Sequence, residues 1–156
     1  MNADAILSAD RNYRYVLSRI WDEKKAMVVF IGLNPSIADE NIDDPTIIRC
    51  INFAKSWGYG GLFMLNLFAF RATKPSDMFN QVDPIGIEND KYIEEYSNKA
   101  DKVICAWGNH GRYMQRSQDI LNQIDNAYYL KLNKSGEPAH PLYLKSERNP
   151  IAFKRN

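Results

Sequence analysis

Four polar segments of the chain carry residue types that could bind a ligand or catalyse a reaction. Each follows an apolar run, and together they hold both histidines of the chain. Amide side chains donate and accept hydrogen bonds, and a histidine can exchange a proton near neutral pH. The alternative interpretation is that the loops of a parallel sheet are always polar and rich in glycine. The four segments are Asn34-Pro35-Ser36, Asn66 with Arg71, Gly108-Asn109-His110-Gly111, and Gly136-Glu137-Pro138-Ala139-His140-Pro141-Leu142.

The first segment runs into an acidic stretch within FIGLNPSIADENIDDPTIIRC, residues 30 to 50. Three interpretations compete: a polar active-site loop, a metal site, or a solvated turn with a helix cap. Asp44 followed by Pro45 is typical of a helix N-cap with proline at the first helical position. Asp39, Glu40 and Asp43 could converge on Mg²⁺, but adjacent carboxylates without spacing are more often solvated. We therefore expect no metal site and no cofactor.

Length and composition favour one compact domain over residues 1 to 156, of which 45% are hydrophobic. The net charge of +1 gives no strong field for nucleic acid or membrane. Two cysteines are too few for a disulfide framework, and Cys105 is expected in the core. Because the N-terminus lacks a signal-peptide pattern and no apolar run could span a bilayer, we expect a cytoplasmic protein with no membrane partner.

The elements that must position these segments follow from the hydrophobic pattern. Apolar, β-branched runs predict strands over residues 13–21, 26–33, 61–70, 102–107 and 127–132. Helical spacing predicts helices from Pro45 to Trp57, from Pro84 to about Ala100, and over residues 113–124. This alternation predicts an α/β fold with three layers, in which helices cover both faces of a central, mainly parallel sheet. Ligands of such sheets bind beyond the carboxyl ends of the strands, so the four polar segments should meet in one site.

The residues also carry a resemblance to a known family. LNPS, DDPT, NLFAFRAT, AWG and GEPAHPLYL occur in this order along nearly the whole chain, and the sequence resembles the DUF1643 family of uncharacterised bacterial and phage proteins. A thinner resemblance, resting on four short motifs and their topology, links the chain to the uracil-DNA glycosylase superfamily. GLNPS resembles the first glycosylase motif, LNLFAFR the base-reading strand, ICAWGNHG the third strand, and HPLYL the final His-Pro-Ser loop.

The glycosylase resemblance implies cleavage of an N-glycosidic bond in DNA or a nucleotide. Such a reaction needs a donor for the departing base and a group that places water behind the sugar carbon. By the resemblance, His140 stabilises the departing base and Asn34 positions the water. The substrate-binding residues that it implies are Gly32, Pro35, Ser36, Asn66, Arg71, Gly108, Asn109, His110, Pro141 and Leu142.

Departures from the glycosylase pattern leave the substrate open. No stacking aromatic follows Pro35, and Leu142 stands where the superfamily has serine. Leu142 could act as a wedge into duplex DNA or as a buried anchor. Uracil, a modified base and a free nucleotide all stay open as substrates. Two alternative functions also stay open: a binding module without turnover, and a metal-dependent phosphate hydrolase that uses the acidic stretch.

Overall fold

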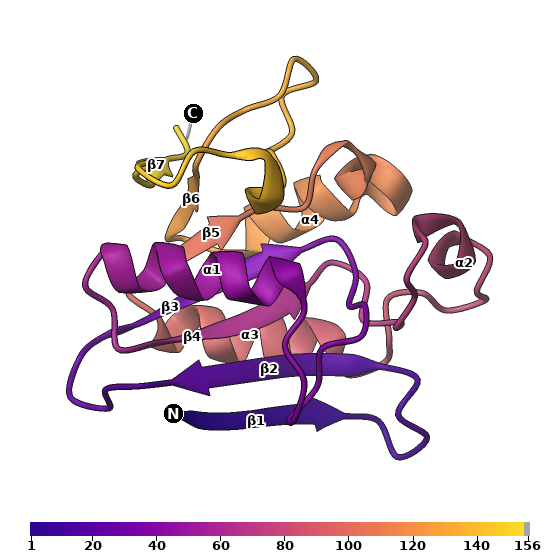
Figure 1. Cartoon of the computed structure of the whole chain (residues 1–156). Helices are drawn as coiled ribbons and strands as arrows, with labels where there is room; N and C mark the ends of the chain where they lie inside the picture. The colour runs from indigo at the N-terminus through magenta and orange to yellow at the C-terminus, as the bar shows by residue number, and fades with distance from the viewer. Residues whose placement is uncertain (155–156) are drawn as a thin grey trace.

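The computed structural model describes residues 1–154 and has an α/β fold; residues 155 and 156 of the predicted domain lie outside the described part. Within the described residues, seven strands form one sheet in the order β1-β2-β4-β3-β5-β6-β7 (Figure 1). The strands are β1 (Asn2–Leu7), β2 (Arg14–Ile20), β3 (Met27–Gly32), β4 (Gly61–Asn66), β5 (Lys102–Cys105), β6 (Ala127–Tyr129) and β7 (Ile151–Ala152). The helices are α1 (Pro45–Ser56), α2 (Pro75–Phe79), α3 (Asn89–Lys99) and α4 (Arg116–Gln123), with 3-10 helices η1 (Asn109–Gln115) and η2 (Pro141–Tyr143).

The α/β prediction is confirmed, but the sheet is mixed. Strands β4, β3, β5 and β6 run parallel, whereas β1 with β2, β2 with β4, and β6 with β7 pair antiparallel. A mainly parallel sheet is therefore wrong as a description of the whole. The cause lies at the two edges of the sheet: β1 and β2 form a hairpin, whose short connection can join only antiparallel strands, and at the other edge the short strand β7 returns beside β6 in the opposite direction.

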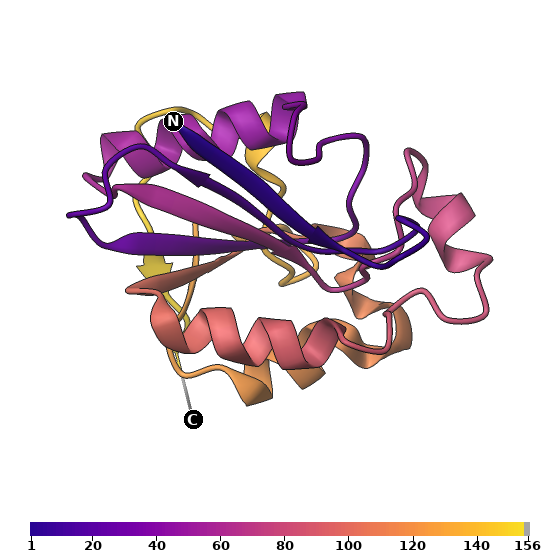
Figure 2. The same cartoon turned by 90° about the horizontal axis from the view of Figure 1, so that it is seen from below.

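Helices lie on both faces of the sheet, as Figure 2 shows from below. Side chains alternate along β3, so that Val28 and Phe30 pack with α1 while Val29 and Ile31 pack with the α3 and α4 side. The strand is buried on both faces, as its apolar sequence predicts. The two apolar clusters fix the sheet between the helices and so hold the strand ends in place.

Helix α1 begins as its sequence predicts. The Asp44 side chain accepts a hydrogen bond from Ile47 N at 2.9 Å, and Pro45 occupies the first turn. Helix α3 begins at Asn89, five residues after the predicted start at Pro84. The carbonyls of Pro84 and Ile85 accept hydrogen bonds from the residue 69–70 backbone, which holds that segment out of the helix.

Two other predicted elements are longer than the observed ones. Strand β4 ends at Asn66, where the backbone carbonyls of Asn66 and Leu67 accept hydrogen bonds from the Asn89 side chain. The helix predicted over 113–124 is broken, since Met114 and Gln115 adopt positive φ at the end of η1, directly before α4. Cys105 lies in the core, as predicted, and burial raises the pKa of its thiol. Among residues 1–154 no helix is both long and apolar enough to cross a bilayer.

Candidate functional site

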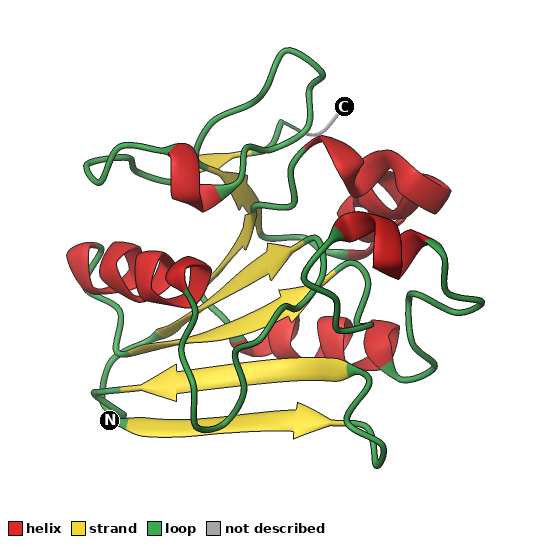
Figure 3. Ribbon diagram, turned by 45° about the vertical axis from the view of Figure 1, so that its right-hand side comes forward, coloured by secondary structure: helices red, strands yellow, loops and turns green. Residues whose placement is uncertain are grey.

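A cavity of about 470 Å³ lies beyond the carboxyl ends of the central parallel strands. Figure 3 shows the strands leading toward loops that gather at this edge of the sheet. A cavity of this size is typical of small-ligand sites. Ten of the twelve predicted site residues line it: Gly32, Asn34, Pro35, Ser36, Asn66, Gly108, Asn109, His110, His140 and Leu142. The topology therefore brings together segments that are far apart in the sequence.

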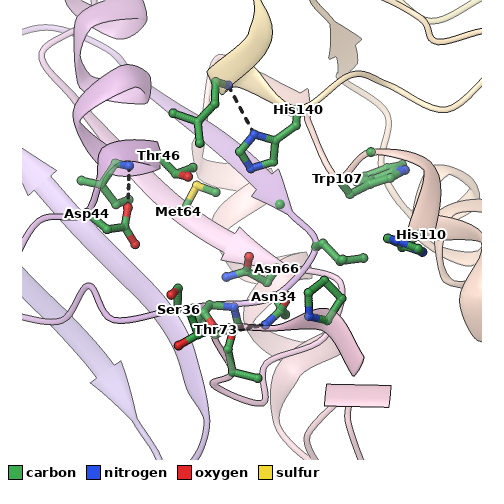
Figure 4. Close-up of a pocket in the computed structure, with 18 of the residues that line it drawn as sticks. Asn34, Ser36, Asp44, Thr46, Met64, Asn66, Thr73, Trp107, His110 and His140 are labelled. Atoms are coloured by element: carbon green, nitrogen blue, oxygen red, sulfur yellow. Dashed lines mark hydrogen bonds between the residues drawn. The ribbon is translucent and has the colours of Figure 1, made fainter. Parts of the chain in front are cut away.

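Asn66 supplies a buried amide to the cavity. Its side chain is 1% exposed, and its Nδ2 has no hydrogen-bond partner among the described residues. Figure 4 shows the amide projecting between Asn34 and Met64. Gly32 lies opposite in the parallel register with β4, and it leaves the space that the amide occupies. An unpaired buried donor is costly, and a ligand with a suitable acceptor removes that cost.

The side chain of Asn34 is held by two backbone carbonyls. Its Nδ2 donates to Pro35 O at 3.1 Å and to Ala72 O at 2.8 Å. These two bonds use both donors of the amide and leave its Oδ1 as the remaining polar atom. The amide thus shapes the loop, as expected for an asparagine before proline, and it also offers a fixed acceptor at the cavity wall. Such an acceptor can orient a water molecule.

His140 caps η2 and has a defined tautomer. Its Nδ1 accepts a hydrogen bond from Leu142 N at 3.3 Å, so in the neutral ring the proton is carried by Nε2. Desolvation by burial lowers the pKa of His140, while the charge of Asp44 raises it in part. The neutral imidazole is therefore favoured near neutral pH, and it presents an N–H donor at Nε2.

The segment Gly108-Asn109-His110-Gly111 contributes mainly the shape of its backbone. Gly108 adopts φ of 77°, a conformation that favours glycine, with open space where a side chain would lie. Asn109 accepts hydrogen bonds at Oδ1 from Asn133 and Ser135, which ties this segment to the following loop. The ring of His110 is exposed and packs edge-on against Phe79. His110 thus lies at the rim.

Two predicted residues do not line the cavity, and one lies differently than expected. Arg71 borders a separate, shallower hollow and donates to Arg11 O and Ile37 O. Pro141, the first residue of η2, is buried. Leu142 is 41% exposed at the cavity, so the expectation that it is a buried anchor is wrong.

The carboxylates of the acidic stretch pair with arginines and with backbone N–H groups. Glu40 Oε1 lies 2.7 Å from the Arg11 guanidinium, and Asp43 Oδ1 lies 2.8 Å from Arg19 Nε. Asp39 Oδ1 accepts from the N–H groups of residues 41 and 42, and these backbone bonds lower the pKa of Asp39. No group of three or more possible metal-ligating residues occurs between residues 1 and 154. The stretch is organised by arginines and by its own backbone.

Sequence reasoning missed several residues of the cavity wall. Among them are Arg14, Asp44, Thr46, Met64, Thr73, Trp107 and Tyr143. Trp107 is 1% exposed, and its Nε1 has no partner among the described residues. The available signal was Arg14, a charged residue among the apolar residues of the strand predicted over 13–21. Asp44 was recognised only as a helix cap, because its second role depends on how α1 meets the sheet.

Comparison with protein families shows that the chain belongs to DUF1643, whose description is "Protein of unknown function", over residues 14–142. The matched range contains all twelve site residues predicted from the sequence, the ten that line the cavity as well as Arg71 and Pro141. Comparison with curated proteins gives no match, and comparison with solved structures gives none either. Family membership is thus established.

Proposed function

We propose that this protein is a nucleobase-directed enzyme that hydrolyses an N-glycosidic bond in DNA or a nucleotide. The observation that carries the proposal is the unpaired Nδ2 of Asn66, buried at the cavity between Gly32 and Met64. A nucleobase edge carries acceptors and donors in one plane, which suits an amide held in a fixed orientation. As part of the same proposal, the fold is a three-layer arrangement of the uracil-DNA glycosylase type, with α1 on one face and α3 and α4 on the other.

The other two residues of the mechanism would act on the two sides of the bond that breaks. As the bond between base and sugar lengthens, negative charge develops on the base and positive charge on the sugar. The Nε2–H of His140 would donate a hydrogen bond to the base oxygen or nitrogen that gains charge. Asn34 Oδ1 would accept a hydrogen bond from the attacking water and hold it behind the sugar carbon. Since an amide cannot take the proton of that water, the proton passes to bulk water or to the departing base anion, and a slow reaction is expected.

The test is the release of free base. The protein is incubated with DNAs that carry uracil, deaminated purines or modified bases, and with nucleosides and nucleotides, and liberated base is detected by mass spectrometry. His140→Asn is the informative variant, because asparagine can still accept the Leu142 N–H but lacks the ring Nε2–H. We expect His140→Asn and Asn34→Ala each to lower the release rate by about 100-fold. Asn98→Ala, an exposed position on α3, is the matched control and should keep the wild-type rate.

The alternatives predict different results in the same assay. A metal-dependent hydrolase would lose activity in the presence of a chelator, whereas the proposed reaction continues. A binding module would retain a nucleotide or nucleic acid but release no base from any substrate. Release that is unaffected by either His140→Asn or Asn34→Ala would contradict the assigned roles.

A further inference from the structure

One wall of the cavity carries two buried charges of opposite sign that the proposed mechanism does not use. Arg14 is 2% exposed and Asp44 is 8% exposed, and both line the cavity. We call this the Arg14–Asp44 wall. Figure 4 shows Asp44, Thr46 and Ser36 along this side and Trp107 and His110 along the other. Because burying a charge is costly, a pair of charges facing a cavity calls for a ligand that contacts them.

Arg14 keeps hydrogen-bond capacity that the protein does not use. Its Nη1 donates to Ala38 O at 3.0 Å, and its Nε has no partner among the described residues. None of the ion pairs in residues 1–154 includes it. Desolvation lowers its pKa to about 10, so the guanidinium is charged at neutral pH. The wall thus holds a buried cation that can donate to a ligand.

Asp44 is half used. Its Oδ1 caps α1 through Ile47 N, while no hydrogen bond within residues 1–154 reaches its Oδ2. The charge of Asp44 offsets part of the lowering that burial causes in the pKa of Arg14 and in the pKa of His140. The carboxylate therefore lies within electrostatic reach of both the cationic side of the wall and the imidazole assigned to the departing base. A ligand group at this wall would be next to the base.

The sign of the charges decides between two kinds of ligand group. A phosphate would gain from Arg14 but would be repelled by the Asp44 carboxylate in a cavity of low dielectric. A sugar hydroxyl is neutral, and it can accept from a guanidinium and donate to a carboxylate. Two neighbouring hydroxyls can satisfy both charges at once. The hydroxyls of Ser36 and Thr46, for which no hydrogen bond is found in the described chain, add donors and acceptors of the same kind.

We infer that the Arg14–Asp44 wall is a subsite for the 2′,3′-hydroxyl pair of ribose. The substrate is then a ribonucleoside, or a ribonucleotide with both hydroxyls free. A nucleotide within a DNA strand has no 2′-hydroxyl, and its 3′-oxygen is esterified, so it would leave both charges unsatisfied. The identification of the ligand as a nucleoside rests on the proposed function, and the hydroxyl pair is what the wall adds to it.

The test compares affinities for ribose and deoxyribose. Dissociation constants are measured by calorimetry for adenosine, guanosine, cytidine, uridine and inosine, each against its 2′-deoxy counterpart. For the preferred base we expect the ribonucleoside to bind at least about tenfold more tightly, as hydrogen bonds to charged groups allow. In Asp44→Asn the ratio of the deoxyribonucleoside to the ribonucleoside dissociation constant should fall toward one. Asparagine can still cap α1, and thermal unfolding verifies that the variant is folded. Asp119→Asn, an exposed position on α4, should keep the wild-type ratio.

Three results would overturn the inference: equal affinity for the two sugars, no binding of any of the ten nucleosides at about 1 mM, or an unchanged ratio in Asp44→Asn. The base-release assay distinguishes a failure of the ribose subsite from a failure of the proposed hydrolysis. Release from DNA together with equal affinities keeps the proposed function and overturns the inference. A ribose preference without release of base from any substrate keeps the subsite and overturns the proposed hydrolysis.

Discussion

Gly32 and Asn66 lie opposite each other at the ends of β3 and β4, and a side-chain carbon at position 32 would lie 2.9 Å from Asn66 Oδ1. The same carbon would lie 2.9 Å from the terminal methyl group of Met64. The glycine is therefore what allows the amide to occupy this part of the cavity. Its role is spatial, because its backbone is that of an ordinary strand.

The first prediction concerns Gly32→Ala. The added methyl group must displace the ends of Asn66 and Met64, which are side chains that can move. We expect the free energy of unfolding to fall by about 1 to 3 kcal/mol, as for other overpacked sites, with the fold retained. Nucleoside binding, measured by calorimetry, should weaken strongly because the amide has moved. Unchanged affinity in a folded Gly32→Ala protein would show that the Asn66 position does not matter for binding.

The second prediction is that Asn66→Leu stabilises the protein while it destroys the site. The buried Nδ2 of Asn66 has no partner among the described residues, so an apolar side chain of similar shape removes an unsatisfied donor. We expect the free energy of unfolding to rise by about 1 kcal/mol, measured by urea denaturation. Ligand binding and any base release should be lost. A large loss of stability instead would mean that the amide has a structural partner, such as a bound water.

The third prediction is a pH dependence of stability that belongs to His140. Burial makes its pKa lower in the folded chain than in the unfolded chain. As the pH falls below the ordinary value of about 6.5, the unfolded chain takes up this proton first, so folding loses stability until the pH passes the lowered folded value. Above about pH 7 the contribution vanishes, since the ring is neutral in both states.

The measurement for this third prediction is urea denaturation of the wild type and of His140→Asn between about pH 5 and pH 7. The wild type should lose more stability toward low pH than the variant does. Carboxylates that titrate in the same range affect both proteins, so the difference isolates the imidazole. Parallel curves for the two proteins would show that the folded pKa of His140 is not lowered.

The fourth prediction separates structure from metal binding in the acidic stretch. Arg19 is 2% exposed, pairs with Asp43, and donates to the backbone carbonyls of Asp39 and Ile42. Arg19→Met removes all these bonds and should lower the free energy of unfolding by about 3 kcal/mol. Asp43→Asn, at a side chain that is 40% exposed, should cost about 1 kcal/mol or less. Both variants and the wild type are measured by urea denaturation, and added Mg²⁺ should not raise the stability of the wild type. A rise in the wild type that Asp43→Asn abolishes would support the metal site.

Local sequence signals predicted α1, its Asp44 cap and the buried strand β3, because caps and alternation depend on residues only a few positions apart. The same signals failed at α3, where Pro84 and Ile85 pair with the backbone of residues 69–70. They also could not show that the sheet is mixed, since the polar strand β1 acquires its role only by pairing with β2.

For the site, the sequence by itself determined which loops meet, because the carboxyl ends of parallel strands share one edge of the sheet. Only the tertiary structure decided which side chains face the cavity. Arg14 and Asp44 come from β2 and the start of α1, thirty positions apart, and neither position reveals the other. The burial of Asn66 likewise depends on Gly32 across the sheet. Side-chain environment is set by packing between distant segments, which short-range propensity and spacing do not encode.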